Sequence, residues 1–229
     1  MEEKLFILAV FVFVAAAIFS HSKNEETLKK YTYLALGDSY TIGEGVPIIQ
    51  SFPYQTVQLL RRNGLHFNAP EIIAVTGWTT QELLTDGIDS NLLQSEYDFV
   101  TLLIGASNQY HGYALELYKN HFETLVKQAV ALAGRNRSHV IVLSIPNGGI
   151  TSLAATSGKE GLLSEIDTYN AINRQISSKY NVHYVDITFG AGEPARSSSS
   201  LASDGVHPLE KQYGRWAIEV SDLILQQLH

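Results

Sequence analysis

The chain has 229 residues, 45% of them hydrophobic and 17% charged, which is enough to bury one substantial core. Its formal net charge of −7 argues against a nucleic-acid partner, because nucleic-acid-binding surfaces concentrate lysine and arginine on one face. The chain has no cysteine, which excludes disulfides, thiolate zinc sites, a cysteine nucleophile and a lipid-modified N-terminal cysteine.

Residues 5–20, LFILAVFVFVAAAIFS, form an uncharged apolar run after Lys4. Such a run resembles a secretory signal, and the SHS stretch at 20–22 offers small residues at a suitable spacing for cleavage. We therefore expect residues 1–22 to be a signal peptide and the protein to be exported, to the periplasm or the extracellular space. The alternative is an uncleaved membrane anchor, although the run is slightly short for a span of about 20 residues.

From about residue 30 onward, short apolar runs alternate with longer segments of helical periodicity, the pattern of a parallel sheet covered by helices on both faces. The runs are rich in valine, isoleucine and leucine without clean alternation, as expected for strands buried on both sides. We expect a single domain over residues 30–229. The expected strands are TYLALG (32–37), EIIAV (71–75), DFVTLLIG (98–105), HVIVLSI (139–145) and VHYVDI (182–187).

Helix boundaries are marked between several of these strands. Ser51 and Pro53 predict the start of a helix that the Asn-Gly pair at 63–64 would end, and residues 79–82 have the spacing of a capping box. Two further helices each carry one apolar stripe with spacings of three and four. The stripe residues, which we expect to be core, are Leu115, Tyr118, Phe122, Leu125, Val126, Ala129 and Leu132, and Tyr213, Trp216, Ala217, Val220, Leu223 and Ile224.

Two segments are rich in glycine, serine and other small residues. The segment 146–161, PNGGITSLAATSGKEG, is too long for a minimal connection and is a candidate pocket rim. The segment 190–202, GAGEPARSSSSLA, leads into the sharper motif SDGVHP at 203–208.

Ligands of an open parallel sheet bind outside the carboxyl ends of its strands, so the residues that follow each strand are the candidates for chemistry. Asp38 and Ser39 come directly after the first strand, and they also fit an ordinary turn in which both cap a helix. Glycine at several strand ends lets a reacting group approach backbone N–H donors. Other strand ends are followed by TGWT (76–79), GASNQ (105–109) and, beyond a loop, SDGVHP (203–208).

Asp204 and His207 supply what a serine needs to become a nucleophile. A serine hydroxyl reacts when an imidazole takes its proton, and the imidazole needs a carboxylate to fix its tautomer. The spacing of three residues lets Asp204 reach His207 within one tight loop. None of the other seven histidines has both an aspartate three residues before it and a proline after it.

No cofactor is expected from the motifs of the chain. A catalytic metal is disfavoured, because no two histidines stand four residues apart and no cysteine is available. Neither a phosphate-binding loop nor a dinucleotide-binding fingerprint follows a strand. The Gly-x-Ser-x-Gly elbow of the common α/β-hydrolases is missing as well, because Thr41 stands where its second glycine would be.

Three blocks of the sequence resemble those of the GDSL, or SGNH, family of serine hydrolases, and the match extends over nearly the whole chain after residue 30. The block ALGDSYTIGEG resembles the family's first block, which implies that Ser39 is the nucleophile. The block VTGWTTQEL is similar to the second, which implies that Gly77 gives a backbone N–H to the oxyanion hole. The block DGVHP resembles the fifth, which implies that Asp204 orients His207 as base and acid.

The third block departs from the family pattern. Family members present Gly-x-Asn-Asp, in which the asparagine amide is an oxyanion donor, whereas GASNQ places Ser107 in the asparagine column and Asn108 in the aspartate column. We take Ser107 as the third donor, beside the N–H groups of Ser39 and Gly77, because Gly105 keeps the family's spacing to it. The competing hypothesis is a shift of one residue that brings Asn108 into the hole.

The resemblance implies a three-layer α/β/α, flavodoxin-like sandwich with a five-stranded parallel sheet, and an exported esterase that works through an acyl-enzyme. The substrate would be a small-molecule or glycan ester: a short acyl ester, a lysophospholipid or an acetylated carbohydrate. An acyltransferase with the same residues is an alternative, and the altered third block suggests another, a non-catalytic binding module. Tyr110, His111 and Tyr113 follow the third block and are candidates either to line the pocket or to pack.

Overall fold

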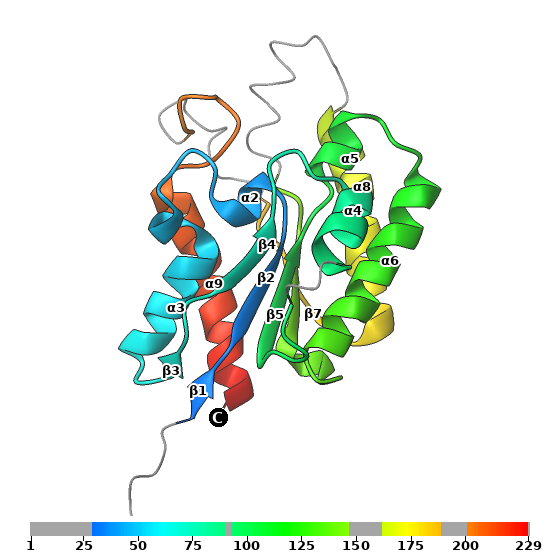
Figure 1. Ribbon diagram of the computed structural model, residues 1–229. Helices are drawn as coiled ribbons and strands as arrows, with labels where there is room; N and C mark the ends of the chain where they lie inside the picture. The colour runs from blue at the N-terminus through cyan, green and yellow to red at the C-terminus, as the bar shows by residue number, and fades with distance from the viewer. Residues whose placement is uncertain (1–28, 90–92, 147–161, 189–200, 229) are drawn as a thin grey trace, which may run out of the picture.

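A computed structural model describes residues 29–89, 93–146, 162–188 and 201–228 of the chain. Its centre is a five-stranded sheet in the order β4-β2-β5-β6-β7, in which every neighbouring pair is parallel (Figure 1). Each strand of this sheet lies inside a predicted range, which confirms the expected five-stranded parallel sheet. The strands are β2 (Tyr33–Gly37), β4 (Glu71–Ala74), β5 (Phe99–Leu103), β6 (Val140–Leu143) and β7 (His183–Val185).

Both faces of the sheet are buried, which explains why the strands read as continuous apolar runs. In β2, Leu34 and Leu36 pack into one core, and Tyr33 and Ala35 pack into the other. All four side chains are at most 1% exposed. Successive side chains of a strand point to opposite faces, so a strand that is covered on both sides is apolar at nearly every position. The exception in β5 is Thr101, whose buried hydroxyl is hydrogen-bonded to the hydroxyl of Tyr33 at 2.9 Å.

Helices cover the two faces in separate layers, as Figure 1 shows. One face packs on α3 (Phe52–Arg62) and α9 (Glu210–Leu228). The other face packs on η2 (Leu83–Ile88), a turn of π-helix that follows α4 (Thr80–Glu82), on α6 (Leu115–Leu132) and on α8 (Leu162–Tyr180). The predicted three-layer α/β/α sandwich is therefore confirmed.

The helix signals in the sequence mark the observed boundaries well. The helix α3 begins after Ser51 and ends before Asn63, and Thr79 caps α4 in a complete capping box with Glu82. In the predicted stripe of α6, the residues from Tyr118 to Ala129 are buried and Leu132 is half-buried. Leu115 is 42% exposed because the first residue of the helix lies beyond the edge of the core. On α9, the buried residues include Tyr213, Trp216, Ala217, Val220 and Ile224.

Several short elements complete the described part of the fold. The helices are α2 (Ser39–Ile42), η1 (Ile48–Gln50), α5 (Ala106–Tyr110) and η3 (Arg137–His139). A separate parallel pair joins β1 (Lys30–Tyr31) to β3 (His66–Phe67). This pair was not predicted, because two residues are too few to display any periodicity.

Some predicted segments lie outside the described residues. They are the expected signal peptide at 1–22, nearly all of the candidate pocket rim at 146–161, and most of the small-residue segment at 190–202. The signal peptide and the rim stay predictions. Within the ranges given above, no helix combines the length and apolar character needed to span a membrane.

Gly37 ends β2 at a point where three segments of backbone come very close together. A β-carbon at this position would lie 2.2 Å from the carbonyl oxygen of Leu103 and 2.2 Å from Oγ1 of Thr41. The glycine is therefore required for space, because α2 turns back against the end of the sheet immediately after it. This close approach places the two residues after Gly37 at the carboxyl edge of the sheet.

We predict that Gly37→Ala destabilises the protein by about 3 kcal/mol, because the new methyl group overlaps backbone that cannot move without distorting β5. The measurement is the free energy of unfolding in urea. The matched control is Gly214→Ala in α9, whose added methyl would meet the flexible end of the Gln55 side chain at 2.9 Å. The control should change stability by less than about 1 kcal/mol, and equal losses in both variants would contradict the steric account.

Candidate active site

Ser39 lies at the carboxyl edge of the sheet, in the turn between β2 and α2. Asp38 caps α2: its Oδ1 accepts the N–H of Tyr40 at 3.0 Å, and its carbonyl oxygen accepts those of Thr41 and Ile42. Ser39 is the first residue of the helix, so its own N–H has no acceptor within α2. Ser39, which is 8% exposed, thus places its hydroxyl beside a backbone N–H that has no acceptor in the helix.

The structure brings Ser39, His207 and Asp204 into one chain of hydrogen bonds. The Oγ of Ser39 lies 2.8 Å from Nε2 of His207, and Nδ1 of His207 lies 2.7 Å from Oδ2 of Asp204. Both distances are within the normal range for hydrogen bonds. When Nδ1 carries the proton and donates to Asp204, Nε2 is free to accept from the Ser39 hydroxyl. This arrangement can withdraw a proton from Ser39.

The loop that carries the histidine is fixed by its own backbone. Oδ1 of Asp204 accepts the N–H groups of Val206 and His207 at 2.8 and 3.0 Å, which leaves Oδ2 for the imidazole. Partial burial raises the pKa of Asp204, but these two N–H groups and the ring outweigh it and hold the pKa below its usual value. A backbone bridge between Leu201 and Pro208 closes the base of the loop.

An aromatic cluster packs against the imidazole ring of His207. The ring of Tyr40 lies 5.0 Å from the ring of His207, centroid to centroid, and 6.3 Å from that of Trp216. Trp216 in turn meets Tyr213 edge to face at 5.2 Å. These residues connect α2 to α9, so packing in the core restricts the orientation of the histidine.

Gly77 follows β4 and forms part of the same edge of the sheet. Its backbone has a φ of +82°, in the left-handed region that favours glycine, and the space where a β-carbon would stand is open. A tight turn is closed by the N–H of Trp78, which donates to the carbonyl of Val75 at 3.2 Å. Gly77 therefore exposes its backbone to solvent directly beyond the end of β4.

Asn108 and Ser107 have different surroundings at the start of α5. The buried amide of Asn108 is used at both ends: Oδ1 accepts the N–H of Thr80 at 2.9 Å, and Nδ2 donates to Oγ1 of Thr80 at 3.0 Å. Asn108 thus fastens α5 to the start of α4. Ser107 is half-buried, and its hydroxyl makes no hydrogen bond with the described residues.

The three aromatic candidates after the third block lie largely at the surface. Tyr110 and Tyr113 are 42% and 44% exposed, and His111 contacts both of their rings. A cavity of about 200 Å³ lies between this turn and α8, and Tyr113, but neither Ser39 nor His207, lines it. Tyr113 therefore borders a hollow that is separate from the hydrogen-bonded serine.

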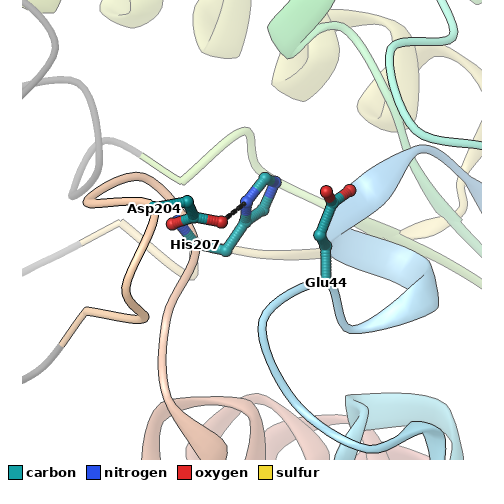
Figure 2. A group of neighbouring side chains, drawn as sticks. All are labelled: Glu44, Asp204 and His207. Carbon is teal, nitrogen blue, oxygen red and sulfur yellow. Dashed lines mark hydrogen bonds and ion pairs between the residues drawn. The ribbon is translucent and has the colours of Figure 1, made fainter.

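A second carboxylate lies beside the histidine. Glu44, Asp204 and His207 each bring one oxygen or nitrogen atom to within 4.8 Å of the others. Figure 2 shows the three side chains. This is the group in the described residues that comes closest to a cation site. We assign no metal to it, because both ring nitrogens of His207 are already engaged, with Asp204 and Ser39.

Comparison with protein-family models matches residues 35–215 to the GDSL-like lipase/acylhydrolase family. The chain belongs to this family. The match covers most of the chain and includes every residue of the hydrogen-bonded site. Membership of the GDSL-like lipase/acylhydrolase family supports the interpretation of this protein as a hydrolase that acts on esters. A comparison with curated proteins found no match.

Solved structures of several other proteins share the fold at low sequence identity. The lipase/acylhydrolase from Enterococcus faecalis has a TM-score of 0.65 at 17% identity, and the match covers 86% of this chain and 95% of that one. The acetylxylan esterase Axe2 from Geobacillus stearothermophilus has a TM-score of 0.64 at 18% identity, covering 86% and 93%. The psychrotrophic esterase EstA from Pseudoalteromonas sp. has a TM-score of 0.62 at 18% identity, and the match covers 86% of this chain and 98% of that one.

Asp38 of the GDSL block is a buried carboxyl with an incomplete set of partners. It is 1% exposed, and its Oδ2 has no hydrogen-bond partner within the described residues. Burial raises the pKa of Asp38 to about 7, and the N–H of Tyr40 offsets only part of this effect. The folded protein therefore holds a proton on Asp38 at a pH where the unfolded chain has released it.

Sequence reasoning did not identify three residues of the site. Tyr40 stands directly after Ser39 in the sequence, and its ring packs on the ring of His207. The burial of Asp38 and the position of Glu44 beside His207 depend on contacts between distant segments. The one available signal was their place within a few residues of Ser39, which marks a region without identifying a role.

Because the pKa of Asp38 is raised in the folded state from 3.8 to about 7, its contribution to stability falls as the pH rises between these values. We predict that Asp38→Asn stabilises the protein relative to wild type by about 2–3 kcal/mol more at pH 8 than at pH 5. Urea unfolding at both pH values measures the difference. Asp222→Asn, an exposed control on α9, should show the same difference at both pH values. A pH-independent effect of Asp38→Asn would be inconsistent with a raised pKa.

Proposed function

We propose that this GDSL-family protein is a serine esterase that hydrolyses carboxylic esters through an acyl-enzyme intermediate. The observation that carries the proposal is the hydrogen-bond chain from Ser39 through His207 to Asp204, with distances of 2.8 and 2.7 Å. A serine, a histidine and a carboxylate in this order form the recurring device for activating a hydroxyl group.

In the first half of the reaction, Oγ of Ser39 attacks the ester carbonyl as Nε2 of His207 takes the hydroxyl proton. The tetrahedral intermediate collapses when the C–O bond to the alcohol breaks, and His207 returns the proton to the departing alcohol oxygen. In the second half, His207 takes a proton from water, the hydroxide attacks the acyl-enzyme, and the proton returns to Ser39. Asp204 stabilises the imidazolium in both halves.

The negative oxygen of each tetrahedral intermediate needs hydrogen-bond donors in place before it forms. The N–H of Ser39, which α2 leaves without an acceptor, and the N–H of Gly77 in its open turn are the proposed backbone donors. Ser107 is the proposed third donor. This assignment is supported by the hydrogen bonds of Asn108, whose amide oxygen and amide nitrogen are both engaged with Thr80 and are therefore not available to the oxyanion.

The proposed substrates are short acyl esters, lysophospholipids and acetylated carbohydrates. Axe2, which has the same fold, is named as an acetylxylan esterase, and this supports including the acetylated carbohydrates. Activation of Ser39 requires no cofactor in this mechanism. Export is also part of the proposal, and its support is the uncharged apolar run at residues 5–20. If this segment is not cleaved, it would instead anchor the protein to a membrane.

The complete hydrogen-bond chain favours a catalytic function over a non-catalytic binding module, because ligand binding alone does not require a serine that is hydrogen-bonded to an oriented imidazole. An acyltransferase would use the same first half-reaction and a different acceptor. Product analysis with and without a sugar or alcohol acceptor distinguishes the two activities.

We predict that Ser39→Ala and His207→Ala each lower the turnover of a short ester by roughly 10⁴-fold or more, because triad members act as a unit. Asp204→Asn should cost less. A panel of p-nitrophenyl esters of rising chain length, run beside acetylated xylan and lysophosphatidylcholine, measures turnover and substrate class together. Circular dichroism checks that the variants are folded. Near-parental hydrolysis by Ser39→Ala, purified free of host esterase, would overturn the assignment.

We predict that Ser107→Asn raises turnover and Ser107→Ala lowers it, because a hydroxyl is a shorter and more freely rotating donor than an amide, and a donor is typically worth about 10²- to 10³-fold. Asn108→Ala should instead lower stability by about 2–3 kcal/mol, because it leaves buried groups of Thr80 unpaired. Turnover is measured per active serine, and stability by urea unfolding. A large loss of turnover confined to a fully stable Asn108→Ala variant would identify Asn108 as the donor.

A further inference from the structure

Glu44 is held firmly at the edge of the site by its backbone. It follows α2 by two residues, and its N–H donates to the carbonyl oxygen of Ser39 at 3.0 Å. Its own carbonyl accepts the hydroxyl of Tyr213 from α9 at 3.1 Å. The position of Glu44 is therefore fixed relative to both the nucleophile and the aromatic cluster.

The side chain of Glu44 turns toward the catalytic histidine. Its carboxylate lies within 4.8 Å of a ring nitrogen of His207 and of the Asp204 carboxylate. In Figure 2 it stands beside the imidazole on the side away from Asp204, with no hydrogen bond to the ring. Its Oε2 accepts the hydroxyl of Thr76, the neighbour of Gly77. Glu44 thus spans the gap between the nucleophile and the proposed oxyanion loop.

The charge of Glu44 has no cationic partner among the described lysines and arginines. Within this part of the chain, Lys29 pairs with Asp98, Lys127 and Lys179 pair with Glu123, and Arg174 pairs with Asp186, all outside the site. The Thr76 hydroxyl is a neutral donor and leaves the charge of Glu44 in place. Glu44 is also half-buried, and partial burial weakens screening by water and salt.

The proposed mechanism places the alcohol part of the substrate near this charge. His207 protonates the departing alcohol oxygen from Nε2, so that oxygen must come within hydrogen-bond reach of the ring. The Glu44 carboxylate lies within 4.8 Å of a ring nitrogen of His207, so we expect a group two or three bonds beyond that oxygen to come within a few ångströms of this charge. The acyl chain is attached to the opposite side of the carbonyl carbon.

We propose that Glu44 is a specificity-determining residue that makes the enzyme prefer esters whose alcohol portion carries a positive charge and discriminate against those with a negative charge. This inference rests on the proposed esterase function, and it narrows the substrate class of the same site. Esters of neutral alcohols fall between the two extremes. Anionic groups close to the scissile ester are disfavoured by direct repulsion from Glu44 and, more weakly, from Asp204.

Three acetate esters with the same two-carbon spacing test the proposal: acetylcholine, 3,3-dimethylbutyl acetate and 2-acetoxyethanesulfonate. They carry a positive, a neutral and a negative group of similar size at the same distance from the ester. The readout is the ratio of kcat/KM for acetylcholine to kcat/KM for the sulfonate. A loss of activity common to all three esters cancels in this ratio.

In the wild-type protein, kcat/KM should be highest for the positively charged ester, intermediate for the neutral ester and lowest for the negatively charged ester. Glu44→Gln keeps an oxygen that can accept from Thr76 and removes the charge, so the ratio should fall on the order of tenfold, as expected for a partly screened charge a few ångströms away. Glu219→Gln, which removes an exposed carboxylate in the middle of α9, should leave all three values unchanged.

An unchanged ratio in Glu44→Gln, or an equal fall of the ratio in Glu219→Gln, would overturn the proposal. So would a loss of the same factor for all three esters, which would make Glu44 a general support of the site. If the wild-type protein hydrolyses none of the esters and a serine-reactive phosphonate does not label Ser39, the esterase function itself fails. Hydrolysis of the neutral ester without discrimination by charge leaves that function standing and overturns only the role of Glu44.

Discussion

The hydrogen bond between Ser39 and His207 joins residues that are 168 positions apart, and the whole site depends on it. One partner is carried by the turn after β2, and the other by the loop that precedes α9. A separation of 2.8 Å can be kept only if sheet, helix and loop are each rigid. The packing of α3 and α9 on one face of the sheet supplies this rigidity, and the hydrogen bond from Tyr213 to Glu44 connects α9 to the segment that follows the Ser39 turn.

Burial of polar groups at the carboxyl edge of the sheet has a cost in stability. Asp38, Ser39 and His207 are all at most 9% exposed, and Oδ2 of Asp38 lacks a hydrogen-bond partner within the described residues. Two apolar cores, one on each face of the sheet, provide the stability that offsets this cost. The same burial limits the contact of the serine and histidine with bulk water, which strengthens the electrostatic interactions on which proton transfer relies.

The sequence was sufficient for the sheet and for the contact between Asp204 and His207, because both depend on local signals. Doubly buried strands read as apolar runs, and a spacing of three residues lets a carboxylate reach an imidazole within its own loop. Other features depend on contacts between segments that are distant in the chain. Examples are the Asn108 amide fastened to Thr80 and the methyl-sized space that Gly37 must leave for Leu103. No pattern in a single sequence encodes contacts between distant segments. The third block could therefore be matched to the family pattern, but the hydrogen bonds between Asn108 and Thr80 could not be predicted.

The central claim is that His207 activates Ser39 as a nucleophile, and covalent labelling tests it most directly. A fluorophosphonate reacts with a serine whose hydroxyl has been activated by a neighbouring base. Incubation followed by tandem mass spectrometry should find one adduct, on Ser39, and the rate of labelling should fall by several orders of magnitude in His207→Ala. Labelling of Ser39 at the same rate in His207→Ala, or labelling of another serine in its place, would contradict the account.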